Sequence, residues 1–481
     1  MILHSKLADL IRLLSQSEYS FVKKLIPALT TDAKLPALFE LIHKTVQNNL
    51  SQLEKKDVHE ELFGAEKYHE QKISNRMTEL LHCVEEALAF ISLRKEEGKR
   101  KTLLLKEFRM KNGNKQVESL ANEWIDKLDN SEPKNGALFY LAHVNHLEYD
   151  NYAIARGVRK KDESLQKASN YLDLYFVVEK LRLTCEMLNR QNIIGAVYDT
   201  GISATLINLL KINGNNYLQH PIIAIYYNIY LTLTDGDNPI HYQKLFRLLQ
   251  KNGKRFEHAE ARQLYEYVQN YCIKKVNTGN VNYITEIFNI YQQQLDFGIL
   301  LNEGELSEYD YKNITSVGLR LEKFDWTHNF IEQYKGKINP SQQKNAYTYN
   351  LSSYFYYTQN YKNAIRLLQD VEFTDVFYHM GAKLMLFKMY YETEQTEPFY
   401  SLIDAFKVYL YRNKGVSLYQ RKSYLNFIRF AKRIFDLKIN PPIPKLFQVR
   451  ISKIQQQMET NKATVSLVWL QERVKEISLS I

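Results

Sequence analysis

Histidine and carboxylate side chains are the first candidates for chemistry in this 481-residue sequence, because they supply metal ligands and acid–base groups. His143 and His146 are one helical turn apart, and Glu148 is nearby. A metal site needs a third ligand in a defined geometry, and the spacing HExxH does not occur. The favoured interpretation is a pair of histidines that face solvent or neighbouring polar groups, and we predict no metal site.

The three cysteines, Cys83, Cys185 and Cys272, are candidate nucleophiles, but they lie far apart among apolar neighbours. This spacing fits neither a disulfide framework nor a zinc ribbon, and buried small side chains explain them better. The motifs GxxxxGK[ST], GxGxxG and GxSxG are also missing from the sequence. We therefore predict no catalytic residue and no cofactor. An active site assembled from distant helices would leave no motif, and a deep pocket lined by converging charged groups would indicate one.

Positive charge is the stronger local signal. The chain has a net charge of +10, and residues 407–453 contain twelve Lys or Arg against the single acid Asp436, a local net of +11 (12 − 1). A second basic run, 94–115, has nine Lys or Arg against three Glu. Charge concentrated in this way bears on binding partners and not on the fold.

A helix over 421–435 would collect five of these cations on one side. At 100° per residue they fall within an arc of about 120°; this basic face is Arg421, Lys422, Arg429, Lys432 and Arg433. Such a face can bind phosphates in a salt-sensitive way, an acidic protein or an anionic membrane. We favour a solvated outer face, in which the long side chains lie over apolar neighbours.

The composition predicts helices as the elements that position these residues. Gly is 17 and Pro is 10, roughly 3.5% and 2% of the chain against averages of about 7% and 5%. The 35 Tyr and 23 Phe argue against disorder. The length exceeds the usual single-core limit of about 250–300 residues, so we expect an all-α protein made of several domains or of a repeat array.

We predict an N-terminal helical module over residues 1–112, ending at a turn over 111–114. Pro27 and the cluster at 30–32 separate short helices, and a short helix at 57–63 ends at Gly64. With a long helix over 69–93 it forms a hairpin at 57–93 that resembles a DNA-binding helix-turn-helix.

In that hairpin Lys72 and Arg76 would face the DNA. An ordinary helical hairpin is favoured, because Glu70 and Glu79 lie next to these cations and would weaken their hold on phosphates.

Residues 113–481 are predicted to form a continuous helical-repeat array. Pro133 and Asn135 precede the first of its helices, and the segment 214–216 with Pro221 is expected to break the chain. The predicted helices are 137–151, 162–190, 221–234, 257–277 and 282–296.

The clearest repeats lie at about 310–410, where large and small residues recur at the 34-residue tetratricopeptide period. The stretch 345–371 is the best formed. Small residues let paired helices approach, and large ones fill the groove between them. The matching positions are Ile314, Val317, Gly318, Leu321, Phe330 and Tyr334; then Thr348, Leu351, Ser352, Phe355, Ala364 and Leu368; then Leu386, Phe387, Tyr390, Phe399 and Ile403.

The order of elements resembles an uncharacterised bacterial family of long tetratricopeptide-like helical-repeat proteins. The segments that carry the resemblance are RMTELLHCVEEALAF (76–90), FDWTHNFIEQYKGKI (324–338), MLFKMYYE (385–392) and YLNFIRF (424–430). The resemblance implies a right-handed superhelix of helical hairpins behind an N-terminal helical module, with no known activity.

In the tetratricopeptide arrangement the inner face of each first helix receives peptide ligands. This resemblance implies a groove formed by Tyr349, Ser353, Tyr356, Tyr357, Leu384, Lys388 and Tyr391, with Thr315, Leu319 and Lys323 from the preceding repeat. The Lys and Asn set that clamps a peptide C-terminal carboxylate is missing, which argues against a chaperone-tail binder. Packing of several of these tyrosines inside the array is the alternative.

The sequence as a whole predicts a cytoplasmic, non-enzymatic scaffold that binds a protein or peptide through this Tyr-rich face. The first residues contain Lys6, Asp9 and Arg12 in place of an apolar signal-peptide core, and no apolar run reaches 18 residues. The alternative is a nucleic-acid-binding regulator that uses the basic helix 421–433. The partner and the oligomeric state are not defined by the sequence.

Overall fold

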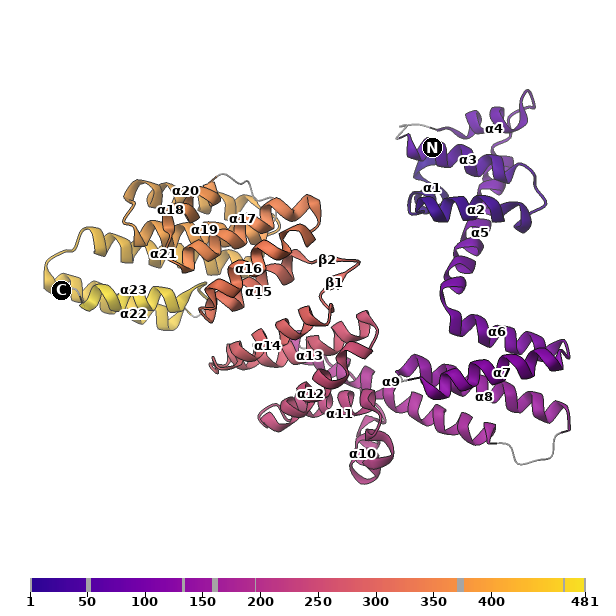
Figure 1. Cartoon of the computed structure of the whole chain (residues 1–481). Coiled ribbons are helices and arrows are strands. Elements are labelled where there is room, and N and C mark those ends of the chain that lie inside the picture. The colour runs from indigo at the N-terminus through magenta and orange to yellow at the C-terminus, as the bar shows by residue number, and fades with distance from the viewer. Residues whose placement is uncertain are drawn as a thin grey trace. The chain divides into compact units, whose positions relative to one another are not determined.

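The computed structural model describes residues 2–48, 53–131, 135–157, 163–194, 196–369, 376–461 and 463–479. Within these residues the chain forms 23 α-helices and three short 3₁₀ helices, and its strands are two residues long (Figure 1). The predicted all-α class is confirmed. No helix in this part of the chain is both long enough and apolar enough to cross a membrane.

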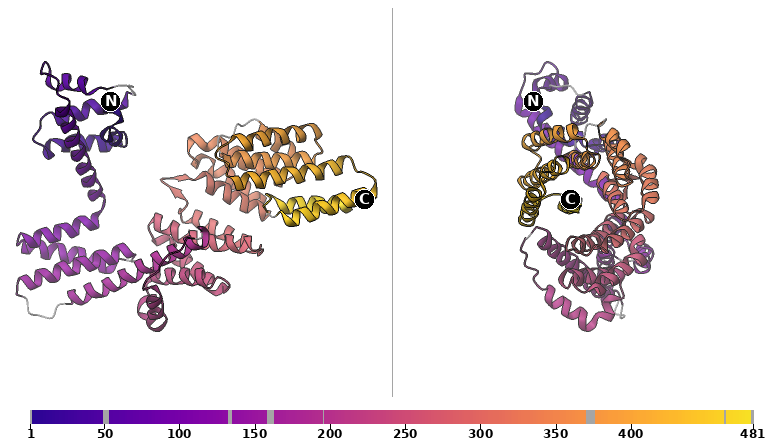
Figure 2. Two further views of the ribbon diagram at one scale, coloured as in Figure 1. Left: turned by 180° about the vertical axis from the view of Figure 1, so that it is seen from behind. Right: turned by 90° about the vertical axis from the view of Figure 1, so that its left-hand side faces the viewer.

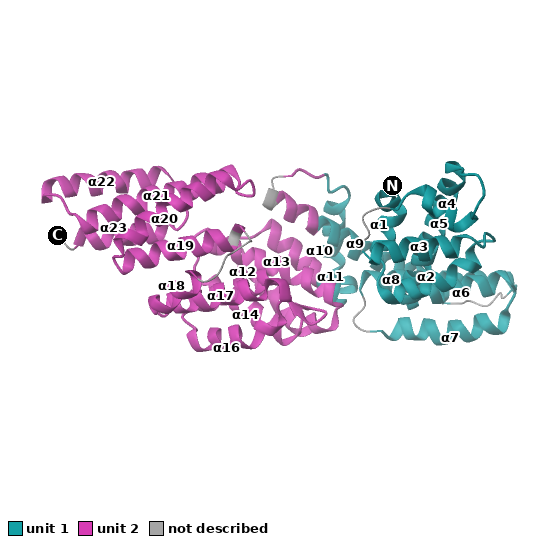
Figure 3. Ribbon diagram, turned by 90° about the horizontal axis from the view of Figure 1, so that it is seen from above, with its two compact units in different colours: residues 1–184, 199–224 teal, residues 185–198, 225–481 magenta. Residues whose placement is uncertain are grey.

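The chain divides into two compact units, residues 1–184 with 199–224 and residues 185–198 with 225–481 (Figure 3). The first eleven helices, the last of which spans the unit boundary at residue 224, are α1 (Lys6–Arg12), α2 (Gln16–Leu29), α3 (Leu35–Gln47), α4 (Lys55–Phe63), α5 (Glu70–Lys95), α6 (Glu97–Met110), α7 (Asn114–Asn130), α8 (Gly136–Ala155), α9 (Ser164–Ile194), α10 (Ser203–Leu218) and α11 (Pro221–Thr234). The 3₁₀ helices are Ile2–His4, Gly253–Arg255 and Lys335–Lys337.

The remaining elements belong to the second unit. They are α12 (Pro239–Asn252), α13 (His258–Asn277), α14 (Tyr283–Asp296), the antiparallel pair β1 (Leu301–Asn302) and β2 (Glu305–Leu306), α15 (Glu308–Arg320), α16 (Phe324–Tyr334), α17 (Pro340–Tyr357), α18 (Tyr361–Gln369), α19 (Val376–Glu392), α20 (Thr396–Arg412), α21 (Leu418–Ile439), α22 (Pro444–Thr460) and α23 (Leu467–Leu479).

Serine side chains fix where several of these helices begin. Ser15 and Ser417 start α2 and α21, and each hydroxyl accepts a hydrogen bond from the backbone N–H three residues later. The side chains of Glu18 and Gln420 bond back to the cap, which completes a capping box in both helices. Polar residues that interrupt the apolar pattern therefore define helix starts.

Two hydrophobic clusters lie among the described residues of the first unit. One joins α1 to α5 through side chains such as Phe39, Ile42 and Val84. The other begins at Leu105 of α6 and includes Trp124 of α7. The predicted module boundary at residue 112 lies within this unit, and it stays a prediction.

The helices from α15 to α20 form three successive hairpins, and the segment α15 to α23 is a stack of roughly antiparallel helices (Figure 1, Figure 2). Each hairpin turns at a non-glycine residue with positive φ: Glu322 (56°), Gln359 (60°) and Glu394 (53°). In each turn the next residue's N–H bonds to a carbonyl five residues back, at 2.8–3.0 Å, as in a Schellman cap. The same turn repeated in consecutive hairpins brings α15, α17 and α19 against one another.

Some sequence predictions differ from the structure in detail. Pro27 lies inside α2 and does not separate helices, because burial of Val22 and Ile26 on the same helix outweighs the hydrogen bond that proline removes. The break predicted at 214–216 is a kink at the neighbouring Asn213, where φ is −112° and ψ is 26°, and α10 then continues to Leu218, before Pro221 begins the next helix. Pro133, Asp162 and residues 370–371 of the best-formed repeat lie outside the described residues.

Candidate functional site

One pocket lies on the first helices of the three successive hairpins. Each helix contributes residues at intervals of three or four, which is the spacing that places side chains on one helical face. The pocket-lining residues are Lys312, Thr315, Ser316 and Leu319 of α15, Tyr349, Asn350, Ser353, Tyr356 and Tyr357 of α17, and Gly381, Leu384, Met385 and Lys388 of α19. The cavity has a volume of about 170 Å³. We call it the α17 pocket, since α17 contributes the most residues.

The α17 pocket collects most of the predicted groove. Eight of the ten groove residues named from the sequence line it: Tyr349, Ser353, Tyr356, Tyr357, Leu384, Lys388, Thr315 and Leu319. Their role in binding a partner stays a prediction.

Tyr391 does not belong to the pocket, which corrects its predicted place. Its side chain is 0% exposed and packs against Phe435 of α21 and Trp469 of α23, with ring centroids 5.7 and 5.2 Å away. Tyr391 therefore fits the alternative interpretation, in which several of these tyrosines pack inside the array. Lys323 is also elsewhere, with Nζ 5.4 Å from the centroid of the Phe288 ring.

The tyrosines form an aromatic wall along α17. Tyr349 contacts Tyr378 edge-on at 4.9 Å, and Tyr356 contacts Tyr357 and Tyr361 at 5.5 and 5.9 Å. Burial raises the pKa of Tyr349, Tyr356 and Tyr357, so their hydroxyl groups keep the proton at neutral pH. The wall is therefore uncharged and can both pack against apolar groups and donate hydrogen bonds.

A glycine on α19 makes room for this wall. A Cβ atom added at Gly381 would lie 2.5 Å from the Tyr349 hydroxyl and 3.1 Å from its ring. Because that separation is far shorter than a normal contact, any other residue at this position would displace the ring. Gly381 thus allows α17 and α19 to enclose the pocket with Tyr349 between them.

Lysines supply the charge of the pocket. Lys312 of α15 lies over the rings of Tyr349 and Tyr378, with Nζ 5.2 and 5.1 Å from the centroids. Lys388 of α19 is half-buried, and its Nζ lies 5.6 Å from the centroid of the Trp469 ring. Burial lowers the pKa of Lys388 to about 8, with Glu472 and Glu392 opposing this shift and Arg473 adding to it.

No family model matches this sequence, and no curated protein matches it.

The predicted basic face is only partly available to a partner. Lys422, Arg429 and Lys432 are exposed, but Arg421 and Arg433 are half-buried and bonded within the protein. Arg421 Nε donates to the Leu410 carbonyl at 2.8 Å, and Arg433 Nη1 donates to the Gln457 side chain at 2.5 Å. Burial and the neighbouring Arg429 lower the pKa of Arg433.

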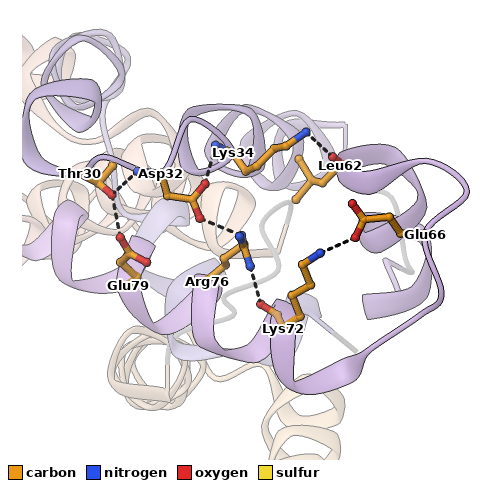
Figure 4. Close-up of polar contacts among 8 residues, drawn as sticks. All are labelled: Thr30, Asp32, Lys34, Leu62, Glu66, Lys72, Arg76 and Glu79. Carbon is orange, nitrogen blue, oxygen red and sulfur yellow. Dashed lines mark hydrogen bonds and ion pairs between the residues drawn. The ribbon is translucent and has the colours of Figure 1, made fainter.

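The cations of the predicted helix-turn-helix are bonded within the N-terminal helices (Figure 4). Arg76 forms an ion pair with Asp32 at 2.8 Å, and Lys72 forms one with Glu66 at 2.5 Å. Both also lie over the ring of Phe63, at 4.9 and 3.8 Å from its centroid. These contacts suit the favoured ordinary hairpin better than the DNA-binding alternative, because Asp32 and Glu66 already pair with the two cations.

The two histidines considered as metal ligands are also bonded to other groups. A ring nitrogen of His143 is 2.8 Å from the Ala168 carbonyl, and Nε2 of His146 is 3.0 Å from Asp129. Glu148 forms an ion pair with Arg109 at 2.8 Å. Across the described ranges no group of three or more His, Cys, Asp or Glu is placed to hold a metal ion.

All three cysteines are buried and free. Burial raises the pKa of each thiol, to about 12 in Cys272. Since the thiolate is the reactive form, these side chains are poor nucleophiles at neutral pH.

Proposed function

We propose that this protein is a non-enzymatic scaffold in which a tetratricopeptide-like, right-handed superhelix of hairpins binds a protein or peptide through the Tyr-rich α17 pocket. The observation that carries the proposal is the gathering of eight of the ten predicted groove residues in one pocket on α15, α17 and α19. The repeated hairpin turn and the contacts among these three helices support a regular superhelix.

The chemistry of the wall suits peptide recognition. Tyrosine buries a large apolar ring at a small cost in conformational entropy, and its hydroxyl still bonds to a peptide. Tyr357 remains 41% exposed beside the more buried Tyr349 and Tyr356, so the wall offers a deep part and an accessible edge. A cytoplasmic location is part of the proposal, and the three free cysteines support it.

A peptide-display selection on the full chain tests this proposal, followed by affinity measurements on the selected peptides. Ser353→Arg places a long side chain in the pocket, and we expect it to weaken binding by about tenfold or more. Ser401→Arg makes the same change at an exposed position of α20 and serves as the matched control. Equal affinity for the two variants, or a selection that yields no binding peptide, would count against the proposal.

Nucleic-acid binding is the second candidate, and it now depends on a smaller set of residues. Lys422, Arg429 and Lys432 are exposed on one helix, and within the described residues none of them forms an ion pair. Binding should then weaken steeply with salt, because each phosphate contact releases a counterion. Titration with duplex and single-stranded DNA at low and moderate salt tests this, and a lack of salt-dependent binding would leave the face as a solvated surface.

A further inference from the structure

The α17 pocket is cationic, although its aromatic wall is neutral. Lys312 and Lys388 enter it from the helices on either side of α17, and none of its thirteen described lining residues is Asp or Glu. A cavity with this lining favours an anionic ligand over a cationic one.

The carboxylates nearest to Lys388 are already bonded to another cation. Glu392 accepts hydrogen bonds from Arg473 at 2.9 and 3.0 Å and from the Trp469 indole at 3.2 Å. Glu472 is largely exposed and lies 4.0 Å from the same arginine. In the described part of the chain Lys388 forms no ion pair, so this half-buried ammonium group has only the Trp469 ring as a close partner.

A buried hydroxyl group also lacks a partner in this pocket. Thr315 is 1% exposed, and its Oγ1 atom makes no hydrogen bond to the described residues. Buried polar atoms are almost always paired, so an unpaired one in a cavity wall indicates a bonding position for a ligand. Thr315 lies on α15, one helical turn from Lys312, so the hydroxyl and a cation share one side of the cavity.

We propose that the α17 pocket binds a carboxylate carried on an aromatic or apolar body, with Lys388 and Lys312 supplying the charge and the Thr315 hydroxyl a hydrogen bond. The tyrosine rings and Leu319 would hold the apolar body. The cavity, about 170 Å³, is close in size to engineered cavities of about 150 Å³ that bind benzene. We assign the carboxylate to an acidic side chain that lies beside an aromatic or apolar residue in a partner peptide. This assignment of the source of the carboxylate rests on the proposed function.

Small probes test the anion chemistry without a peptide. The full chain is titrated by calorimetry with 3-phenylpropanoate, with its neutral analogue 3-phenylpropanamide and with phenyl phosphate. We expect the carboxylate to bind about tenfold or more tightly than the amide, since the two differ only in the charged group. Equal affinities for carboxylate and amide would overturn the proposal, and so would binding of phenyl phosphate alone.

Variants of two lysines on α19 test whether 3-phenylpropanoate binds at Lys388. Lys388→Met keeps the length of the side chain and should weaken 3-phenylpropanoate about tenfold, whereas Lys388→Arg should retain binding. Lys383→Met is the control, because Lys383 is a half-buried lysine of the same helix that lines a different cavity, and burial lowers its pKa too. Unchanged binding in Lys388→Met, or an equal loss in Lys383→Met, would overturn the assignment.

Thr315→Val provides a second variant in case Lys388→Met folds poorly. It preserves the shape of the side chain and removes an unpaired buried hydroxyl, so the melting temperature should stay equal or rise while carboxylate affinity falls severalfold. Full affinity in Thr315→Val would exclude the hydroxyl from the site.

The outcome of the peptide selection separates this inference from the proposed function. Selected peptides that bind but carry no excess of Asp or Glu, with no preference for the carboxylate probe, would overturn the inference and leave the scaffold function standing. Binding of 3-phenylpropanoate without any selected peptide would support the anion site and overturn the peptide as its source.

Discussion

At the scale of single residues, Lys388 makes the pocket sensitive to pH. Its ammonium group must be protonated to attract an anion, and burial lowers its pKa to about 8. Most Lys388 side chains are charged at pH 7 and neutral at pH 9. The charged groups acting on it are Glu392 on its own helix and Glu472 and Arg473 on α23. The same lysine therefore sets the strength of anion binding and its pH range.

We expect the affinity for 3-phenylpropanoate to fall several-fold as the pH rises from 7 to 9, because Lys388 loses its charge in this interval. Calorimetric titration at the two pH values measures the change. In Lys388→Met the remaining pH dependence should be much smaller. A wild-type affinity that is constant across this range would show that Lys388 does not hold the anion.

A half-buried acid in the first unit, Asp129, is expected to affect stability at low pH. Burial alone would raise the pKa of Asp129, but hydrogen bonds from Lys167, His146 and Tyr171, at 2.8–3.0 Å, lower it to about 2. A carboxylate whose pKa is lowered in the folded state stabilises the protein above its unfolded value. This contribution is lost as the pH falls from about 4 to 2.

Asp129→Asn should therefore lower the free energy of unfolding by about 1–3 kcal/mol at pH 7 and reduce the loss of stability between pH 4 and 2. Denaturant titrations at several pH values provide the measurement. Asp126→Asn changes an exposed acid of the same helix, and we expect a shift within about 0.5 kcal/mol. Equal shifts in the two variants would mean that the bonds to Asp129 contribute little.

At the scale of elements, the hairpin turns contain a strain that glycine would relieve. Glu322, Gln359 and Glu394 have the left-handed backbone conformation, which costs a non-glycine residue roughly 1–2 kcal/mol. Gly279, which follows α13, has a φ of 102°. As in the three hairpin turns, the N–H groups of Gly279 and of the next residue, Asn280, bond to carbonyl groups of the preceding helix. The turn geometry is thus kept even where the sequence does not favour it.

Gln359→Gly should raise the free energy of unfolding by up to about 1 kcal/mol, because the side chain is exposed and only the backbone preference changes. Thermal denaturation measures the effect. The reverse change, Gly279→Ala, meets no atom within 4 Å and should destabilise by about 1–2 kcal/mol. A loss of stability in Gln359→Gly would contradict this explanation of the turn.

The packing of the second hairpin depends on a small residue. Ala364 of α18 is 0% exposed at the position predicted to be small, within a hairpin whose two helices are in contact. Ala364→Trp should overpack this contact and lower the free energy of unfolding by roughly 1–3 kcal/mol or more. An unchanged melting temperature would show that the contact tolerates bulk and that the assigned repeat register is wrong.

At the scale of the whole molecule, the helices and most of the pocket followed from local patterns. Residues three or four positions apart on one helix lie on the same face in any surroundings. The sequence therefore sufficed to place Tyr349, Ser353 and Tyr356 of α17 together. The place of Tyr391 depended on Trp469, which is 78 residues later and covers it (469 − 391). Helical spacing cannot show which residue of a face a distant helix will bury.

The charged residues show the same limit. Arg76 and Arg433 read as available cations because Asp32 and Gln457, their partners, lie 44 and 24 residues away in the sequence (76 − 32 and 457 − 433). A local turn signal misled in the opposite direction at Pro27, where the helix continues. Contacts between elements that are distant in the sequence decide both cases, and the local patterns of a single sequence do not predict those contacts.

The proposed function requires a partner peptide to occupy the face formed by α15, α17 and α19. Hydrogen–deuterium exchange on the full chain, with and without a peptide from the selection, shows which helices the peptide covers. We expect the peptide to slow exchange in residues 308–320, 340–357 and 376–392, and to cause no such slowing in Ser353→Arg. Slower exchange confined to α21, or to the N-terminal helices, would contradict it.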